Sequence, residues 1–363
     1  MLIILISLLC IIAELWIISD LELSEKDKNK LYFGVIFLEF FIILGFRDIS
    51  VLGDTDSYAY HFNKILNKVT PFYIVKANDR FSIGYLIFEQ FIYQEVSSSF
   101  LFYNIVTTFL ILGSSLLFFY KYSASLPLTL YLFIVSKLVF SEAIALRQGL
   151  ALSFLLLGYG FLFKDKNIKY IVCVLLASTF HSSAWILFLI PLLCIKSISF
   201  KIKRNILLAI ACFVFIVFET LLHGYIDVGE RYQNASEKAG FFSLVGVFNM
   251  LVALMAYGYT MYMERLAKKN EMNLNFEELR LITLLYFIVS TMSIRLFVFE
   301  RFAIYFLPLV FVYISYLYYD LKYIKSARVA TFLFLFAQTV SSLFVMCYRP
   351  EWTKILPYSF YQS

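Results

Sequence analysis

Charged residues are scarce in this sequence, and their scarcity argues against a soluble globular protein. Lys, Arg, Asp and Glu make up 15% of the 363 residues, whereas 61% are hydrophobic and 20% are aromatic. Together with a mean hydropathy of +0.81, these fractions are typical of a polytopic helical membrane protein. At about 20 residues per crossing, the chain has room for roughly ten to twelve spans. The sequence therefore predicts one all-α transmembrane bundle over residues 1–363, with no separate soluble domain.

The sequence also lacks the motifs of several common enzyme classes. It has no glycine-rich phosphate loop and no HExxH, CxxC or GxSxG motif, which argues against nucleotide hydrolysis, zinc-dependent proteolysis and an α/β-hydrolase. Its five cysteines lie in apolar segments without the pairing of a metal site or a disulfide framework. The net charge of +6 is spread over many loops, so nucleic acid is not an expected partner.

Apolar runs predict where the chain crosses the membrane. Ten runs have spanning length or nearly so: 2–19, 31–46, 99–119, 126–140, 143–163, 205–222, 241–263, 279–294, 302–319 and 329–346. The first has neither a basic start nor a cleavage site, so we expect it to be a retained helix. The run 170–195 is too long for one untilted helix and too short for two full spans, and His181 and two serines interrupt it. We expect two short helices broken there; the alternative, one tilted span, would reverse the side of every later segment.

Basic residues assign the two sides of the membrane. Six loops contain 18 of the 31 basic residues: 20–30, 120–125, 164–169, 196–204, 264–280 and 320–328. They alternate consistently with the spans only if 170–195 goes out and back, and the positive-inside rule places them in the cytoplasm. Both termini, the long loop 47–98 and a second loop at 223–240 are then predicted on the outer side.

Lysine and arginine divide between these two sides. Of the 20 lysines, 14 lie in the predicted cytoplasmic loops, whereas 7 of the 11 arginines lie outside or at outer helix ends. A guanidinium group suits bidentate recognition of phosphate or carboxylate, because its donors form a fixed fork. The bias predicts a phosphate-bearing ligand at the outer face. The alternative is that these arginines pair with acidic residues on that side or extend to lipid headgroups.

The stretch 46–62, FRDISVLGDTDSYAYHF, is a dense polar cluster directly after an apolar run. Asp54 and Asp56 have two interpretations: a carboxylate held at the membrane surface to take a proton from a hydroxyl, or an N-cap of the following helix. Metal binding by the aspartates of this stretch has no supporting spacing. Apolar residues at helical spacing then predict two interfacial helices, at 58–69 and 81–93.

Three further candidates occur at the predicted outer ends of later segments. Arg147 and Gln148 begin a span shortly after Glu142, beside small residues, which favours an arginine head in a polar cavity over a lipid-facing anchor. His181 is either a hydrogen-bonded structural residue or faces a wet cavity, because broken helices at membrane depth need such surroundings. Arg301 follows a glutamate, so an ion pair is its simplest explanation.

Four segments occur in a fixed order along the chain: FRDISVLGDTDSY, EAIALRQGLALSF, LLASTFHSSAWILFLIPL and ERFAIYFLP. On the order and spacing of these segments, the sequence resembles the EpsG-type, Wzy-like polymerases of bacterial surface polysaccharides. Two departures concern the acceptor side. Phe81-Ser82 follows Arg80 where such proteins often carry an acidic residue, and residues 223–240 match no segment of the family.

The resemblance implies a GT-C-like architecture and a glycosyltransferase of the bacterial inner membrane whose active site faces the periplasm. Such enzymes transfer a growing glycan from undecaprenyl diphosphate to the non-reducing-end hydroxyl of a new lipid-linked repeat unit, with no cofactor and no metal. Arginines would hold the diphosphate as its charge grows, and a carboxylate or imidazole would act as general base. The implied partners are undecaprenyl-diphosphate-linked oligosaccharides, membrane lipids and a chain-length regulator protein.

Under this resemblance the candidate residues take three roles. The diphosphate ligands are expected to be Arg47, Arg147 and Arg301, with Arg80 as a weaker fourth. The general base is expected to be Asp54, ahead of His181, Asp56 and Glu142. Contacts to sugar or isoprenoid are expected from Tyr58, Gln148 and Tyr305.

Two other functions compete with a polymerase. An O-antigen ligase-type transferase would need much the same arginines and base, and differs only in its acceptor. A polysaccharide flippase or other transporter would show internal repeats and charges along the middle of the bundle. We find no repeat, and the strong charges cluster at the outer ends of the spans, which favours a transferase.

Overall fold

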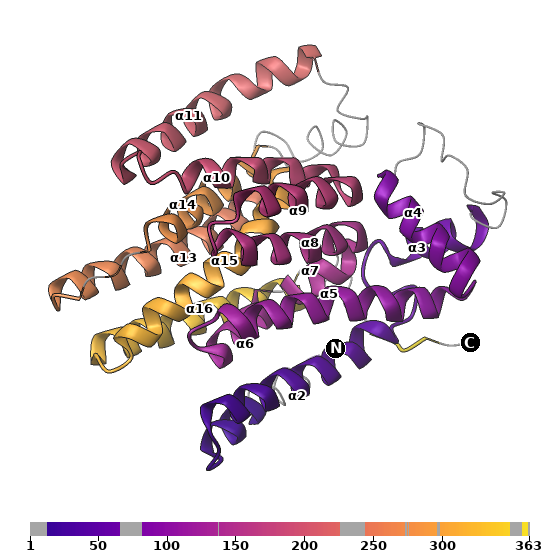
Figure 1. Ribbon diagram of the computed structural model, residues 1–363, viewed down its shortest axis with the longest axis horizontal. Coiled ribbons are helices and arrows are strands. Elements are labelled where there is room, and N and C mark those ends of the chain that lie inside the picture. Colours follow the sequence, from indigo (N-terminus) through magenta and orange to yellow (C-terminus); the bar gives the residue numbers. More distant parts are fainter. Residues whose placement is uncertain are drawn as a thin grey trace. The chain divides into compact units, whose positions relative to one another are not determined.

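The computed structural model of the protein describes residues 13–65, 82–136, 138–225, 244–272, 274, 276–295, 298–348 and 358–361. Apart from short connections and one isolated antiparallel bridge between Arg47 and Phe360, these ranges are helical (Figure 1). The predicted all-α fold is confirmed. The chain forms two compact units, which we call unit one (Met1–Trp185 with Gln338–Ser363) and unit two (Ile186–Ala337).

Unit one contains most of the candidate residues. Its helices are α2 (Glu25–Gly45), α3 (Thr55–Tyr60), α4 (Ile83–Phe91), α5 (Phe100–Tyr122), α6 (Leu126–Val135), α7 (Leu138–Ile144), α8 (Leu146–Leu162) and α9 (Asn167–Phe180). Single π-helical turns, His61–Ile65 and Ile92–Val96, continue α3 and α4. Such turns are rare and are frequent at functional sites. The predicted interfacial helices 58–69 and 81–93 thus correspond to helical segments at 55–65 and 83–96, and residues 66–81 lie outside the described residues.

Aromatic contacts fix the directions of the long helices in unit one. Phe33, near the start of α2, lies 6.0 Å from Tyr120, near the end of α5, so these two helices are antiparallel. Tyr122 lies 5.1 Å from Phe163, at the end of α8. One end of unit one therefore carries seven of its lysines: Lys26, Lys28, Lys30, Lys121, Lys164, Lys166 and Lys169. Arg47 and Arg147 lie at the opposite end, where α2 ends and α8 begins.

The helix break predicted at His181 is confirmed. Helix α9 ends at Phe180, and His181 adopts an extended conformation with φ −148° and ψ 121°. A 3-10 helix, η4 (Ser182–Leu189), follows. The polar side chains of His181 and Ser183 bond each other at this point, in competition with a continuous helix.

Unit two consists of helices around α14 and α15. After the end of η4 it contains α10 (Ile190–Leu193), α11 (Phe200–Tyr225), α13 (Leu244–Lys269), α14 (Glu277–Met292), α15 (Val298–Leu321) and the first half of α16 (Lys325–Tyr348). Inside it, Arg280 Nε and the Tyr313 hydroxyl both donate hydrogen bonds to Oε1 of Glu264. This network joins α13, α14 and α15 and satisfies a carboxylate that lies among apolar helices.

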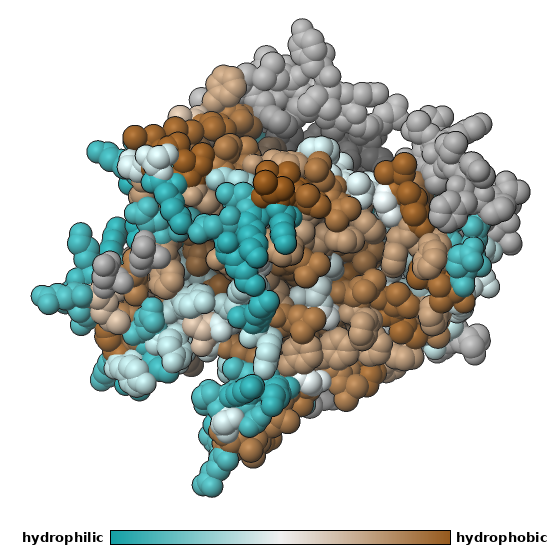
Figure 2. All heavy atoms as spheres, in the orientation of Figure 1, coloured by the Kyte–Doolittle hydropathy of each residue, from teal (hydrophilic) through white to brown (hydrophobic). Residues whose placement is uncertain are grey.

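The helices have the length and surface of a membrane protein. Four described helical segments are long and apolar enough to cross a bilayer, Phe100–Tyr122, Leu244–Lys269, Phe299–Leu321 and Lys325–Val345, and the α6–α7 pair, bent by 53°, is a fifth if it counts as one span. Exposed Phe332, Phe336 and Leu117, at 58–67% exposure, illustrate the apolar outer surface that Figure 2 shows in brown. The polytopic helical class is confirmed, whereas the count of ten to twelve crossings stays a prediction.

Candidate functional site

Arg47 is the most buried arginine of the site, with 1% of its surface exposed. Its guanidinium donates to the carbonyl of Leu44, to the carbonyl of Ala143 at 3.0 Å, and to Oγ1 of Thr55 at 3.4 Å. Asn104 donates to the Leu44 carbonyl at 3.1 Å. Burial lowers the pKa of Arg47 to about 10, so the group stays charged at neutral pH. Arg47 thus satisfies carbonyls at the ends of α2 and α7 that helix geometry leaves without partners.

A segment near the C-terminus holds the Arg47 backbone in place. Asp48 N donates to the Ser359 carbonyl at 3.0 Å, and Tyr361 N donates to the Phe46 carbonyl at 2.9 Å. The Tyr358 hydroxyl donates to a carbonyl in the last turn of α2. Residues 358–361 thus pair with the loop that carries Arg47, which we call the arginine loop.

The carboxylates of Asp54 and Asp56, at the start of α3, have different hydrogen bonding. Asp54 occupies the N-cap position of α3, yet its side chain makes no capping hydrogen bond and is exposed. The Asp56 carboxylate accepts a hydrogen bond from the backbone N–H of Ser57 at 2.7 Å. Just before them, Leu52 has φ 64°, in the left-handed region that leucine rarely occupies. Such backbone strain is commonest at functional sites, and it leaves the Asp54 carboxylate outside the helix end rather than bonded to it.

Arg147 and Tyr58 meet at the start of α8. The half-buried guanidinium of Arg147 donates a hydrogen bond to the buried Tyr58 hydroxyl. Burial raises the pKa of Tyr58, whereas the charge and hydrogen bond of Arg147 lower it and the charge of Asp54 raises it further. Both Arg147 and Asp54 are therefore close enough to act on one phenol. The structure brings together the predicted arginine, the predicted base and the predicted tyrosine.

A buried histidine–glutamate pair lies beside this group. Nδ1 of His61 lies 2.7 Å from Oε2 of Glu89, and neither side chain is more than 7% exposed. The Tyr85 hydroxyl donates to Oε1 of Glu89 at 3.3 Å, and the Tyr103 hydroxyl donates to Tyr85 at 2.9 Å. Burial raises the pKa of Glu89, and the hydrogen bonds of His61 and Tyr85 and the charge of Arg147 oppose the shift.

Sequence reasoning missed this pair. It treats His61 only as part of an apolar helical face, and it does not single out Glu89. The available signal is that Glu89 falls on the same helical face as Tyr85, four residues earlier, which is predicted to be buried. A carboxyl group on an apolar helical face requires a hydrogen-bonding partner. His61 is the histidine of the same loop, 47–98, and is therefore the partner to consider.

Glu142 and Gln148 lie on either side of the α7–α8 junction. Oε2 of Glu142 accepts a hydrogen bond from Ser115 at 3.0 Å, and its side chain borders a small cavity that Thr108 also lines. Gln148 is buried in the first turn of α8. The backbone at Gly149 approaches α7 so closely that a Cβ there would lie 2.5 Å from the Glu142 carbonyl oxygen. This close approach is the kind of helix contact that small residues allow.

The other candidates are more distant in the sequence. Nδ1 of His181 lies 2.5 Å from the Ser183 hydroxyl, and the ring is buried. Phe180 packs 6.2 Å from Phe88 of α4, so His181 lies at the same end of unit one as Glu89. Arg301 and Tyr305 belong to α15 of unit two, where Arg301 is half-buried and Tyr305 fully buried. Arg80 and the loop residues 226–243 lie outside the described residues.

Comparisons with known proteins give one match. The model of the EpsG family matches residues 30–360 of the chain, a range that includes every candidate residue described above. Searches among curated proteins and among solved structures found no match.

Proposed function

The chain belongs to the EpsG family, which indicates a polysaccharide-polymerase type of function in a membrane, and from this premise we propose that it joins lipid-linked repeat units. The donor is a growing glycan on undecaprenyl diphosphate, and the acceptor is the non-reducing-end hydroxyl of a new lipid-linked unit. The reaction takes place at the outer face of the bacterial inner membrane. The family match over residues 30–360 is the observation that carries this proposal.

The transfer makes one glycosidic bond and breaks one. The acceptor hydroxyl oxygen attacks the anomeric carbon of the donor sugar, and the bond between that carbon and the diphosphate oxygen breaks. The lipid diphosphate leaves with the electron pair, while the hydroxyl proton passes to a general base. Catalysis then requires a cation where the diphosphate gains charge and a base beside the acceptor hydroxyl.

In our proposal Arg147 is the first diphosphate ligand. It is half-buried at the end of an apolar bundle, so its charge acts with little screening by water. Its hydrogen bond to Tyr58 fixes the direction of the guanidinium. Arg301 and Arg80 remain proposed ligands from the sequence pattern. Because the donors of Arg47 already bond three protein oxygens, we assign Arg47 first to positioning the loop.

Asp54 is the proposed general base. Its carboxylate is exposed, makes no capping bond and lies near the phenol that Arg147 contacts. A base must reach the acceptor hydroxyl, and the exposed Asp54 meets that requirement better than the buried His181 or Glu142. Asp56 stays behind Asp54, since its carboxylate already accepts a backbone N–H. Gln148 and Tyr305 remain proposed substrate contacts.

The decisive assay supplies the purified full chain with undecaprenyl-diphosphate-linked repeat units as the only substrate. We expect a ladder of longer glycans without ATP and in the presence of EDTA. Arg147→Lys should lose most of the activity, because an ammonium group cannot reproduce the guanidinium fork. Arg265 is an exposed arginine of unit two, so Arg265→Lys is the matched control and should keep the activity.

Each negative result has a defined meaning. No ladder with an authentic substrate would refute the polymerase proposal, and a ladder that EDTA abolishes would refute the metal-free mechanism. Transfer only to a lipid A core acceptor would show a ligase instead. A chain-length regulator protein is a proposed partner: its addition should narrow the ladder without being required for it.

A further inference from the structure

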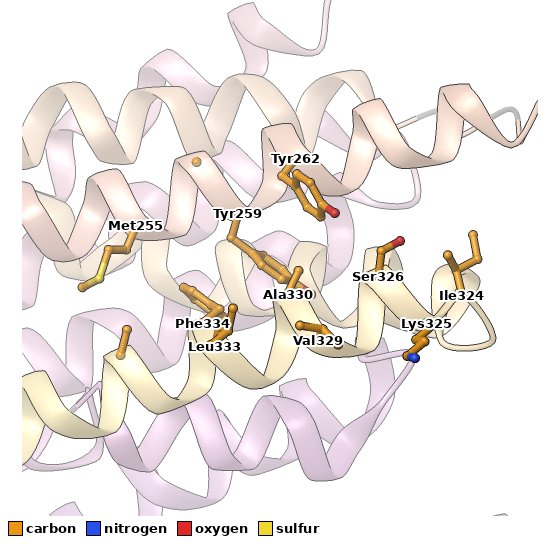
Figure 3. Close-up of a pocket in the computed structure, with 12 residues that line it drawn as sticks. Met255, Tyr259, Tyr262, Ile324, Lys325, Ser326, Val329, Ala330, Leu333 and Phe334 are labelled. Atoms are coloured by element: carbon orange, nitrogen blue, oxygen red, sulfur yellow. The ribbon is translucent and has the colours of Figure 1, made fainter.

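An apolar groove runs between α13 and α16 within unit two (Figure 3). Its volume is about 930 Å³, at the upper end of the usual range for ligand sites. The Tyr259 hydroxyl exchanges a 2.8 Å hydrogen bond with Oγ1 of Thr331, and its ring stacks on Phe334 at 4.5 Å. Both contacts join α13 to α16 along the wall of the groove.

The groove is polar at one end and apolar along the rest of its length. Tyr262, Lys325 and Ser326 lie at one end, and Met255 and Leu333 lie further along (Figure 3). Both helices that form it are candidate membrane spans. An apolar groove between two candidate spans that is polar at one end matches a lipid, whose tail is apolar and whose head stays at the interface.

The mouth of the groove is cationic. Lys325 is the charged residue among the described residues that line it. Lys322, in the connection between α15 and α16, and Arg328, in the first turn of α16, flank it in sequence, against a single acidic residue, Asp320 at the end of α15. Basic pockets between transmembrane helices on the cytoplasmic side bind anionic lipid headgroups. The connection 320–328 is one of the lysine-bearing loops that the positive-inside rule places on that side.

We propose that this groove binds one anionic phospholipid of the cytoplasmic leaflet, with an acyl chain between α13 and α16 and the phosphate on Lys325. This lipid-binding site goes beyond the proposed polymerase activity. The lipid diphosphate substrate is assigned to the arginine side of the membrane, whereas the mouth of this groove belongs to a lysine-bearing loop. The phospholipid therefore occupies a separate site, with a stabilising role in unit two.

Gly258 allows a direct test, because it lines the groove and a Cβ there would meet no atom within 4 Å. Gly258→Phe should fill the groove without a clash against the protein. Gly34→Phe is the matched control, since Gly34 in α2 also has open space around its Cβ position. The full chain is purified in detergent and titrated with phosphatidylglycerol or phosphatidylcholine, and bound lipid is counted by native mass spectrometry.

We expect wild type and Gly34→Phe to retain one phosphatidylglycerol at least fivefold more tightly than phosphatidylcholine, and Gly258→Phe to lose that molecule. Lys325→Glu tests the headgroup separately: its side chain is exposed, so the fold is unaffected, and its preference for phosphatidylglycerol should disappear while Lys26→Glu keeps it. Equal binding of the two lipids by wild type, or retention by Gly258→Phe, would overturn the proposal. Competition by undecaprenyl phosphate at equal concentration would identify a polyprenyl site and overturn it as well.

Discussion

His61 and Glu89 approach to 2.7 Å although 28 positions separate them, and both side chains are buried. The contact joins the π-helical turn after α3 to α4. Asp54 at the N-cap of α3 and Tyr58 on its buried face belong to the same segment as His61, so the pair joins the segment that carries them to α4. We infer that this contact stabilises the segment that carries the proposed base, Asp54.

A double-mutant cycle measures the interaction free energy between His61 and Glu89. His61→Ala leaves the buried Glu89 carboxyl without its imidazole partner and should cost about 3 to 5 kcal/mol of unfolding free energy. Adding Glu89→Leu removes the unpaired carboxyl, so the double variant should lose less than the sum of the two single variants. Denaturant unfolding in detergent micelles provides the numbers. Strictly additive losses would show that the two side chains do not interact.

The protonation of Glu89 should give the protein a pH-dependent stability. Burial raises the folded-state pKa of this carboxyl above its ordinary value of 4.5, so the folded chain holds the proton to higher pH than the unfolded chain does. The contribution of Glu89 to stability is therefore fully present below pH 4.5 and is lost as the pH rises through the raised pKa. We expect the difference in unfolding free energy between wild type and Glu89→Gln to fall over this window. A constant difference from about pH 4 to pH 7 would contradict the shift.

Asp54→Asn separates a catalytic role from a structural one. Because the Asp54 side chain makes no capping hydrogen bond, the substitution should change stability by no more than about 0.5 kcal/mol. Loss of a general base should lower the rate of glycan transfer by about 100-fold or more. Asp56→Asn, whose amide oxygen can still accept the Ser57 N–H, is the control and should stay active. Wild-type rates in Asp54→Asn would assign the base elsewhere, first to His181.

Gly149→Ala tests whether the close contact of α7 and α8 matters for the site. The new Cβ would lie 2.5 Å from the Glu142 carbonyl oxygen and 2.8 Å from Cδ1 of Ile111. Overpacking of this kind costs about 1 to 3 kcal/mol, and it should shift Arg147 and reduce transfer.

Gly113→Ala is the matched control for this prediction. The atom nearest to its new Cβ would be a ring carbon of Phe37, at 3.9 Å. The substitution should leave activity unchanged and, through helix propensity, raise stability by about 0.5 to 1 kcal/mol. Equal unfolding free energies and equal rates of glycan transfer in Gly149→Ala and Gly113→Ala would show that the α7–α8 contact does not position Arg147.

Hydropathy and local chemistry predict much of the fold. The described helices follow most of the predicted apolar runs, with boundaries shifted by a few residues because polar first turns, as in α2 after Ser24, extend helices beyond their apolar parts. The run 126–140 is instead divided between α6 and α7, and residues 2–12 of the predicted first helix lie outside the described residues. The break at His181 is predictable because a polar triplet interrupts a run of unsuitable length. The separation of lysines from Arg47 and Arg147 also follows from the sequence, since helix ends alternate between two sides.

The arrangement of the site is less predictable, because its contacts link distant residues. Sequence chemistry predicts Arg47 as a phosphate ligand, but it cannot show that the guanidinium bonds the carbonyls of Leu44 and Ala143. Asp54 is identified as a base or a cap, and only the backbone geometry shows that it has the cap position without the cap bond. Glu89 is missed because a glutamate on an amphipathic helix is usually exposed.

The bridge between Arg47 and Phe360 has a consequence for the timing of synthesis. Its two residues are more than 300 positions apart, so the arginine loop cannot receive its last backbone partners until the ribosome has translated nearly the whole described chain. At about 5 to 20 residues per second, this delay is about 15 to 60 s. During that interval the loop that carries Arg47 lacks its bonds to residues 358–361. The loop therefore reaches its final hydrogen bonding only after residues 358–361 have been translated.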